Sequence, residues 1–331
     1  MINKIVRLIL LPLLLVVLLF SPKSLFSQKK KDSSSNIFLA DPTIFYNNGT
    51  YYLYGTGAGK YADGFAAYTS SDLKKWKGPV GISDGFALKK GDAYGDSKFW
   101  APQVFEYNNK FYIAYAANEH IGIAVSDNPL GPFKQDNHTA ISEDIKQIDP
   151  FIFIDDDRKK YLYYVIVANG GNRIFVAEIN DDILSVKKET EKLCIEATSQ
   201  WENTANAKWS VTEGPTVIKH KGFYYLLYSA NDFRNIDYAV GYAVSKSPLG
   251  PWKKYEGNPI IHRNMTGKNG SGHGDIVKGK NGDLFYVFHT HNAVDKVAPR
   301  RTAIIKMQFK NNKSGIDKLA VGAGSFYYLS R

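Results

Sequence analysis

Among its 331 residues the sequence has one cysteine, Cys194, so an internal disulfide is excluded, and no cysteine–histidine cluster has zinc spacing. It also lacks a concentrated basic segment apart from residues 29–31, although basic side chains outnumber acidic ones by 42 to 32. We therefore expect no nucleic-acid partner. No long amphipathic helix pattern is present, which argues against a helical fold.

The chain opens with the pattern of an export signal. Lys4 and Arg7 precede an apolar stretch, residues 8–20, and a short polar segment ends at Ser27. This order of regions predicts a signal peptide over residues 1–27. The apolar stretch is short for a membrane span, so the alternative of an uncleaved anchor is less favoured. We expect a secreted or periplasmic protein with no stable membrane insertion after signal cleavage. A flexible linker is predicted over residues 28–36.

Aromatic residues are abundant. They make up 14% of the chain, with 22 Tyr, 19 Phe and 5 Trp. Tyr and Phe favour strands, and Tyr and Trp offer sugars an apolar face beside a polar edge. Hydrophobic content of 44% and charged content of 22% exclude disorder for most of the chain.

One pattern of strands occurs five times. A first strand opens on a short motif, a turn follows, then an aromatic strand, then a strand rich in small residues. The five opening motifs are Asp41-Pro42, Trp100-Ala101-Pro102, Ile148-Asp149-Pro150, Glu213-Gly214-Pro215 and Gly272-His273-Gly274. Successive motifs lie 60, 48, 65 and 60 residues apart. This repeat predicts an all-β fold, a five-bladed β-propeller over residues 37–331. A pair of β-sandwiches would also have many short strands, but it would not repeat its side chains in this way.

The repeat predicts a ring of functional side chains. In a propeller the first strand of each blade lines the central channel, so residues at matched positions converge. We expect Asp41, Trp100, Asp149, Glu213 and His273 to form this ring. A turn-capping role would explain one acidic residue but explains three poorly. Clustered, buried carboxylates raise each other's pKa, which keeps one protonated while another is ionised, as glycoside hydrolysis requires.

These five motifs, in this order and spacing, resemble those of the family 43 glycoside hydrolases over about residues 38–310. The resemblance implies a five-bladed propeller that inverts the anomeric centre. It implies that Asp41 is the general base, that Glu213 is the general acid, and that Asp149 raises the pKa of Glu213 and orients it. Blades one and four are not adjacent in a ring of five, which suits a base and an acid that face each other across a sugar.

The resemblance also implies substrate and ion contacts. Trp100 would be a wall of the sugar site, with core packing as the alternative. An arginine before the third strand of blade five would bind the sugar, and because side chains alternate only one of Arg300 and Arg301 can point inward; we favour Arg300. His273 would bind substrate or lie beside a calcium ion held through water, the alternative being a histidine hydrogen-bonded inside the channel. No cofactor is expected to be required.

Two features lie outside the ring. His289 and His291 have the alternate spacing that puts both on one face of a strand. The long loop 194–212 carries Trp201 and Trp209, and long loops in compact domains often shape binding sites. We expect this loop to form a wall of the pocket.

The sequence therefore predicts an exported, inverting glycoside hydrolase whose partner is an oligo- or polysaccharide. The resemblance favours an exo-acting α-L-arabinofuranosidase or β-xylosidase on plant polysaccharide fragments. An endo-α-1,5-L-arabinanase or a galactan-active hydrolase is the alternative within the family. A non-catalytic glycan-binding propeller would keep the aromatic residues and lose one acid. A transferring propeller with a nucleophilic Asp would need its two carboxylates about 5 Å apart.

Overall fold

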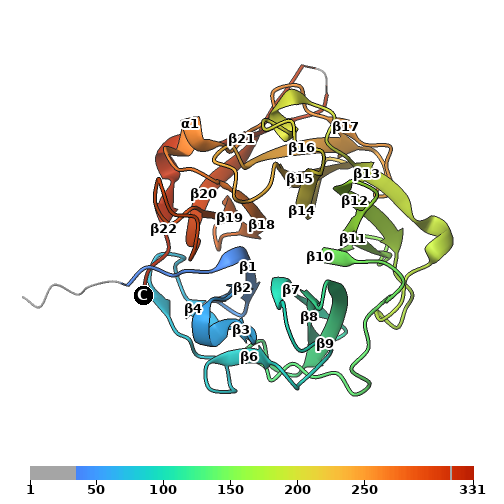
Figure 1. The fold of residues 1–331 in the computed structure, drawn as a ribbon, viewed down its shortest axis with the longest axis vertical. Coiled ribbons are helices and arrows are strands. Elements are labelled where there is room, and N and C mark those ends of the chain that lie inside the picture. Colours follow the sequence, from blue (N-terminus) through green and yellow to red (C-terminus); the bar gives the residue numbers. More distant parts are fainter. Residues whose placement is uncertain (1–34, 314) are drawn as a thin grey trace, which may run out of the picture. The chain divides into compact units, whose positions relative to one another are not determined.

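Five groups of antiparallel strands are arranged radially around a central axis, and the first strand of each group lies nearest to that axis (Figure 1). The computed structural model describes residues 35–313 and 315–331, so the predicted signal peptide and most of the predicted linker lie outside the described residues. The five inner strands are β1 (Ala40–Asn47), β7 (Trp100–Tyr107), β10 (Gln147–Ile154), β14 (Ser210–His220) and β18 (Gly272–Lys278). The fold is the five-bladed β-propeller that the repeat predicts.

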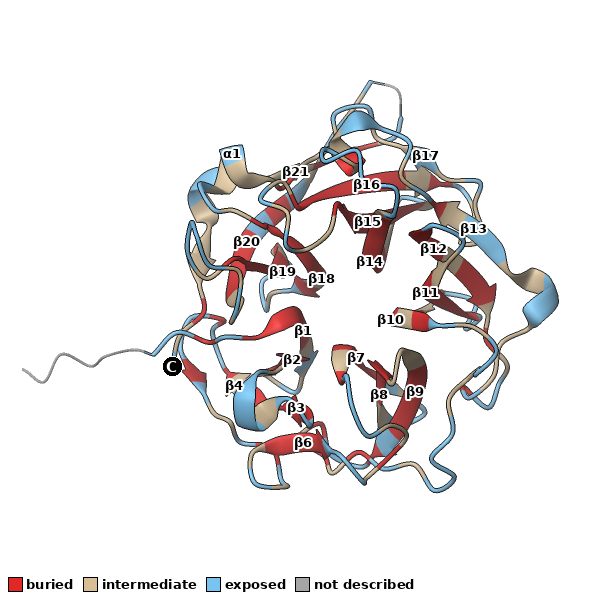
Figure 2. Ribbon diagram, in the orientation of Figure 1, coloured by how far each residue is buried: buried red, intermediate tan, exposed pale blue. Residues whose placement is uncertain are grey.

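Each inner strand pairs with an aromatic second strand, which pairs in turn with a third. The second strands are β2 (Thr50–Thr56), β8 (Lys110–Ala117), β11 (Lys160–Ala168), β15 (Phe223–Ala230) and β19 (Leu284–Thr290). The third strands are β4 (Tyr68–Ser70), β9 (His120–Ser126), β12 (Gly171–Glu178), β16 (Ala239–Ser245) and β20 (Arg301–Lys310). Side chains on both faces of the second strands are buried, because neighbouring blades pack against each face. Figure 2 shows this burial along the inner and second strands.

The outer edges of the blades are short and irregular. They comprise β5 (Trp76–Lys77), β13 (Lys192–Ile195), β17 (Lys253–Lys254), β21 (Lys318–Val321) and β22 (Tyr327–Tyr328), with a separate pair formed by β3 (Gly64–Ala66) and β6 (Phe86–Lys89). The α-helix of the described residues is a single turn, α1 (Arg263–Thr266), and short 3-10 turns lie at Gly59–Tyr61, Lys188–Thr190, Gln200–Glu202 and Ala323–Ser325. Across the described ranges, no helix has the length and apolar character needed to cross a membrane.

The two ends of the described chain close the ring. The Ile37 N–H donates to the carbonyl oxygen of Leu329 at 3.0 Å, and Asn36 forms a bridge with Ser330. The Trp76 N–H of the first blade donates to the Ser330 carbonyl at 3.2 Å. The predicted linker boundary therefore shifts, because residues 35 and 36 are paired with the C-terminus rather than free.

Every inner strand carries a β-bulge at its start, beside the channel. One residue in each bulge has a left-handed backbone: Asp41 (φ 48°), Ala101 (φ 45°), Asp149 (φ 54°), Gly214 (φ 60°) and His273 (φ 46°). These are the equivalent positions of the five blades. The expectation that Trp100 and Glu213 occupy matched positions is therefore wrong by one residue, because each precedes the left-handed residue of its own bulge. Non-glycine residues in this conformation cost about 1 kcal/mol or more, and such strain gathers at functional sites.

Candidate active site

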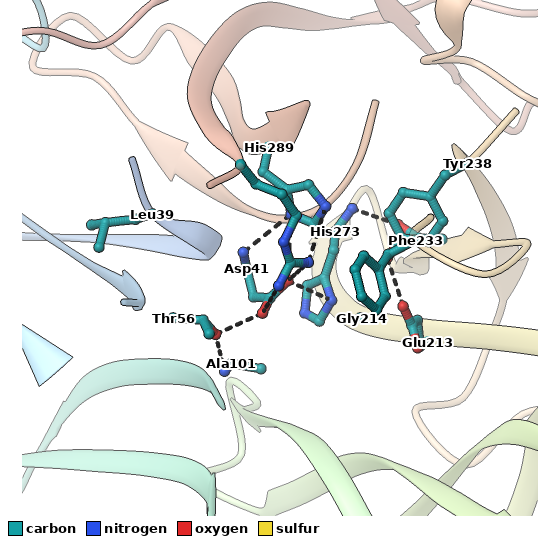
Figure 3. Close-up of polar contacts among 12 residues, drawn as sticks. Leu39, Asp41, Thr56, Ala101, Glu213, Gly214, Phe233, Tyr238, His273 and His289 are labelled. Carbon is teal, nitrogen blue, oxygen red and sulfur yellow. Dashed lines mark hydrogen bonds and ion pairs between the residues drawn. The ribbon is translucent and has the colours of Figure 1, made fainter. Parts of the chain in front are cut away.

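Three carboxylates and a histidine meet where the inner strands begin. Asp41, Asp149, Glu213 and His273 are 7%, 5%, 9% and 8% exposed, so each is buried but retains contact with solvent. The bulges place them there, because each bulge redirects a side chain at the channel mouth. The His273 Nδ1 atom lies 3.4 Å from Asp41 Oδ1 and 3.8 Å from Asp149 Oδ2. Figure 3 shows His273 between Asp41 and Glu213.

Gly214 allows this close arrangement. A Cβ atom at this position would lie 2.8 Å from Cδ2 of His273, closer than real contacts permit. Its φ of 60° is also one that glycine adopts without strain. The imidazole therefore packs directly on the backbone that follows Glu213, so His273 lies against both the Glu213 strand and Asp41.

Asp41 is surrounded by donors. Thr56 donates its hydroxyl to Oδ2 at 2.6 Å, and Arg300 Nη1 lies 3.0 Å from Oδ1. Burial alone would raise the pKa of Asp41, but Arg300, His273, His289 and the Thr56 hydroxyl together hold it well below the usual range of an aspartate. Asp41 is therefore an ionised carboxylate at neutral and mildly acidic pH.

The two buried histidines are neutral neighbours of Asp41. Burial lowers the pKa of His273, and burial together with Arg300 lowers that of His289 far more. The Asp41 N–H points at His289 Nδ1 at 3.1 Å, while Arg300 Nη1 lies 3.3 Å from Nε2 of the same ring. Because a neutral imidazole accepts at only one nitrogen, only one of these N–H groups donates to His289 at a time.

The surroundings of Asp149 and Glu213 have the opposite effect from those of Asp41, because they raise the pKa of both groups. Burial raises the pKa of Asp149 well above that of an ordinary aspartate, and the charges of Glu213 and Asp41 add to this effect. The Gly214 N–H, which donates to Asp149 Oδ2 at 3.1 Å, lowers the pKa only in part. Burial likewise raises the pKa of Glu213 to about 7. The two groups titrate as a pair, so the pair retains a proton at a pH where Asp41 is ionised.

Two polar side chains hold the Glu213 carboxyl. Tyr238, which is fully buried, donates its hydroxyl to Oε1 at 2.8 Å. Asn172 donates from Nδ2 to Oε2 at 3.4 Å. Tyr238 stacks on His289 with ring centroids 5.7 Å apart, so the supports of Glu213 and of Asp41 touch each other. The orientation of both carboxyls is therefore set by one connected group of residues.

Of the two predicted arginines, Arg300 reaches the site. Arg301 begins β20, and its guanidinium lies 3.5 Å from the centre of the Tyr328 ring instead. The Arg300 guanidinium also lies 4.5 Å from the centre of the Phe233 ring. Figure 3 shows Phe233 beside Glu213 and Tyr238. Phe233 thus covers the Arg300 side of the Arg300–Asp41 ion pair, from the loop of blade four.

The remaining predicted residues have different surroundings. Trp100 begins β7, is half-buried, and lies under the ammonium group of Lys98 at 5.8 Å. Trp201 packs into the core against Tyr228, so it is not a wall of the pocket, whereas Trp209 is 46% exposed. His291 bonds to the Phe233 carbonyl at 2.9 Å and supports the loop rather than the carboxylates.

The residues beside His273 do not fit a directly bound calcium ion. Below the carboxylates the channel contains a cavity of about 20 Å³, which has room for about one water molecule. Asp275 lines it, but its two oxygens already accept the hydroxyls of Thr43 at 2.6 Å and Thr216 at 2.7 Å. Calcium prefers about six to eight oxygen ligands. Within residues 35–313 and 315–331, no group of three His, Cys, Asp or Glu side chains is arranged to hold a metal. An ion held through water stays a prediction.

Sequence reasoning missed several residues that shape the site. Thr56 and Phe233 were not singled out, and neither Asn172 nor Tyr238 belongs to the opening motifs. Thr56 ends a second strand, Asn172 lies at the start of a third strand, and the other two belong to the loop between β15 and β16. The repeat carries no signal at these positions. His289 lies against Asp41, whereas its alternate spacing with His291 left open whether either histidine reaches the pocket.

Asp41 is an ionised carboxylate, the Asp149–Glu213 pair retains a proton, and His273 lies against Asp41 and Asp149. A buried carboxylate beside a buried protonated carboxyl is an acid–base arrangement of the kind that hydrolyses glycosidic bonds. Comparison with known families agrees with this class. The sequence model of Glycosyl hydrolases family 43 matches residues 34–314. The chain belongs to this family, and it is a hydrolase of glycosidic bonds.

Three relatives illustrate the range of similar proteins. The crystal structure of an endo-1,4-beta-xylanase from Bacteroides thetaiotaomicron is 40% identical, with a TM-score of 0.82 over 90% of this chain and 98% of that one. A xylosidase/arabinosidase of Humicola insolens is 30% identical, over 66% of this chain and 79% of its own length. A beta-D-galactofuranosidase of Aspergillus niger is 25% identical, over 84% of this chain and 81% of its own.

Proposed function

We propose that the protein is an exported, inverting, exo-acting hydrolase that releases terminal α-L-arabinofuranosyl or β-D-xylosyl residues from plant polysaccharide fragments. The observation that carries the reaction is the contrast between Asp41, whose pKa is held low, and the Asp149–Glu213 pair, whose pKa is raised. An inverting hydrolase needs this difference, with one carboxylate ionised and one carboxyl protonated at the same pH. Export rests on the signal pattern of residues 1–27.

The proton transfers follow from this contrast. Asp41 accepts a proton from a water molecule as the water oxygen bonds to the anomeric carbon. Glu213 gives its proton to the glycosidic oxygen as the bond from that oxygen to the anomeric carbon breaks. Asp149 keeps the proton on Glu213 by electrostatic repulsion, since the effect of each charge on the other is mutual. The Arg300 guanidinium and the Thr56 hydroxyl keep Asp41 ionised, and Arg300 is placed to bind a sugar hydroxyl.

The loops above the site support exo action. The connection between second and third strands has eleven residues in blade one, eight in blade four and ten in blade five, but only two in blades two and three. The long loops of blades four and five are linked, because His291 bonds to the Phe233 carbonyl. Gly270, just before β18, also donates its N–H to Ile236 of the blade-four loop at 3.1 Å. A wall on one side of the site suits a substrate that ends there.

The experiment is hydrolysis of a panel of aryl glycosides by residues 28–331: α-L-arabinofuranoside, β-D-xyloside and β-D-galactoside. We expect cleavage of one of the two pentosides, with the inverted anomer appearing first in the proton NMR spectrum. Asp41→Asn is expected to abolish turnover on every substrate. Glu213→Gln is expected to lower it by about 100-fold or more on natural glycosides, and less where the leaving group needs little protonation.

Other results would contradict the proposal in identifiable ways. First appearance of the retained anomer would exclude inversion. Cleavage of debranched arabinan or xylan, with no cleavage of the aryl pentosides, would indicate an endo enzyme. Binding of these polymers without any hydrolysis would indicate a glycan-binding propeller. Full activity of Glu213→Gln on natural glycosides would exclude Glu213 as the general acid.

A further inference from the structure

Trp209 presents an unusually exposed aromatic ring beside the acidic pair. It is the residue before β14, four residues ahead of Glu213 in the sequence, and it is 46% exposed. Its only polar atom is satisfied, because Nε1–H donates to Asn172 Oδ1 at 3.0 Å. An indole whose polar edge is bound and whose apolar face meets solvent is suited to stacking on a sugar ring.

Asn172 connects this indole to Glu213. The indole N–H can only donate, so the oxygen of the Asn172 amide must face Trp209. The amide nitrogen is then directed at Glu213 Oε2, 3.4 Å away. Asn172 is 9% exposed, so its amide has little freedom to turn. The position of the ring and the orientation of the carboxyl are therefore coupled through one side chain.

Backbone pairing holds Asn172 beside the segment that joins Trp209 to Glu213. Strand β12 of blade three runs parallel to the start of β14 of blade four, with Gly171 opposite Ser210 and Asn172 opposite Val211. The two strands lie beside each other in Figure 1. Trp209 therefore stands at the gap between blades three and four, and it is fixed from its C-terminal side.

The loop before Trp209 is also anchored. Glu202, whose side chain is completely buried, accepts the backbone N–H groups of Thr198 and Ser199 at 2.7 Å each and the Tyr228 hydroxyl at 2.6 Å. The Thr204 N–H donates to Asn231 Oδ1 at 2.8 Å, at the start of the blade-four loop. A rigid support of this kind presents the ring in one place, which lowers the entropic cost of binding to it.

Trp209 also borders the low side of the site, which is the side of blades two and three, where the connections between second and third strands are short. The turn at the top of blade three is only Asn169-Gly170, next to the segment that pairs with Ser210. Arg300 and Phe233 belong to the long loops of blades five and four. A glycan whose terminal sugar ends at that wall would extend past Glu213 toward the low side, where the ring of Trp209 is exposed.

We propose that the exposed face of Trp209 binds the first sugar of the leaving group, and that Asn172 is a positioning residue that aligns Glu213 with that sugar. This assignment rests on the proposed glycosidase function and adds to it a binding site for the leaving group. It makes hydrolysis depend on Trp209 only when the leaving group is itself a sugar.

The test compares two substrates of the pentose that the aryl panel identifies: the disaccharide and the glycosyl fluoride. The fluoride has no sugar on its leaving side, and its departure needs little protonation. For the disaccharide we expect Trp209→Ala to lower kcat/KM by about tenfold or more, mainly through KM. Asn172→Ala should lower kcat about tenfold. Both variants should stay within about twofold of the wild type on the fluoride. Leu193→Ala alters an exposed apolar side chain of blade three away from the site, and it should leave kcat/KM unchanged on both substrates.

Equal loss on both substrates would overturn the proposal, because it would indicate a structural role for Trp209 and Asn172. No loss on either would overturn it as well. If the wild type hydrolyses no glycoside, the proposed function fails, and calorimetric titration with pentose oligosaccharides then decides the role of Trp209. Binding that Trp209→Ala weakens would support a sugar platform there, and binding that is unchanged would overturn it.

Discussion

At the residue scale, the Glu213 carboxyl is subject to opposing influences. Burial and the charge of Asp41 favour its protonated form, whereas the Tyr238 hydroxyl, which donates to Oε1, favours its ionised form. The balance leaves the pKa of Glu213 at about 7. A general acid works only while protonated, so kcat/KM should fall as the pH rises through this value.

Tyr238→Phe tests this balance. The substitution removes the hydroxyl and keeps the ring that stacks on His289, so the pKa of Glu213 should rise. A hydrogen bond to a charged group contributes roughly 1.5 kcal/mol or more, so the alkaline limb of the kcat/KM profile should move to higher pH by about one pH unit. Tyr255→Phe, a change of a tyrosine that stacks on Tyr242 outside the site, should leave the profile unchanged. A limb that stays in place or moves to lower pH would show that Glu213 does not control it.

At the element scale, the loop between β13 and β14 depends on one carboxylate. Glu202 is fully buried, and its Oε2 also accepts the ammonium group of Lys254 at 2.6 Å. Removing one partner of a buried charged network leaves the others without partners, which costs about 3 kcal/mol or more. The loop should therefore lose its fixed conformation before the blades unfold.

Glu202→Ala is expected to lower the free energy of unfolding by about 3 kcal/mol, measured by urea denaturation. It should also reduce activity on the disaccharide more than on the glycosyl fluoride, because the loop carries Trp209. Glu256→Ala is the matched control, since Glu256 is exposed. A Glu202→Ala variant as stable as the control would contradict the anchoring role.

The elements also explain what the sequence could and could not predict. The five opening motifs recur because each blade needs the same bulge at the channel, so the fold and the residues within the motifs were predictable. The alignment of Trp100 and Glu213 was wrong by one residue, because the left-handed position of the bulge is the residue directly before the Pro or Gly of each motif, which is Ala101 in blade two and Gly214 in blade four. Thr56, Tyr238 and Asn172 lie outside the motifs. Their approach to the carboxylates depends on how neighbouring blades pack, which a single sequence does not reveal.

At the scale of the whole molecule, the ring is closed by its last residues. Strand β22 pairs with β20 of blade five, and the Trp76 N–H of blade one donates to the Ser330 carbonyl. Leu329 is fully buried in a core cluster shared by the first and last blades. The site requires this closure, because Asp41 belongs to the first blade whereas Arg300, His289 and His273 belong to the last.

Deletion of residues 327–331 should therefore destabilise the propeller and inactivate it together. Loss of the Leu329 side chain from the core alone costs about 2 kcal/mol, and the lost backbone hydrogen bonds of Ile37, Thr302 and Trp76 add to this cost. Thermal unfolding should show a lower Tm, and kcat should fall because Asp41 separates from Arg300. Deletion of Arg331 alone removes exposed contacts and should cost less than about 1 kcal/mol. If the longer deletion kept wild-type stability and activity, the active site would not depend on contact between the first and last blades.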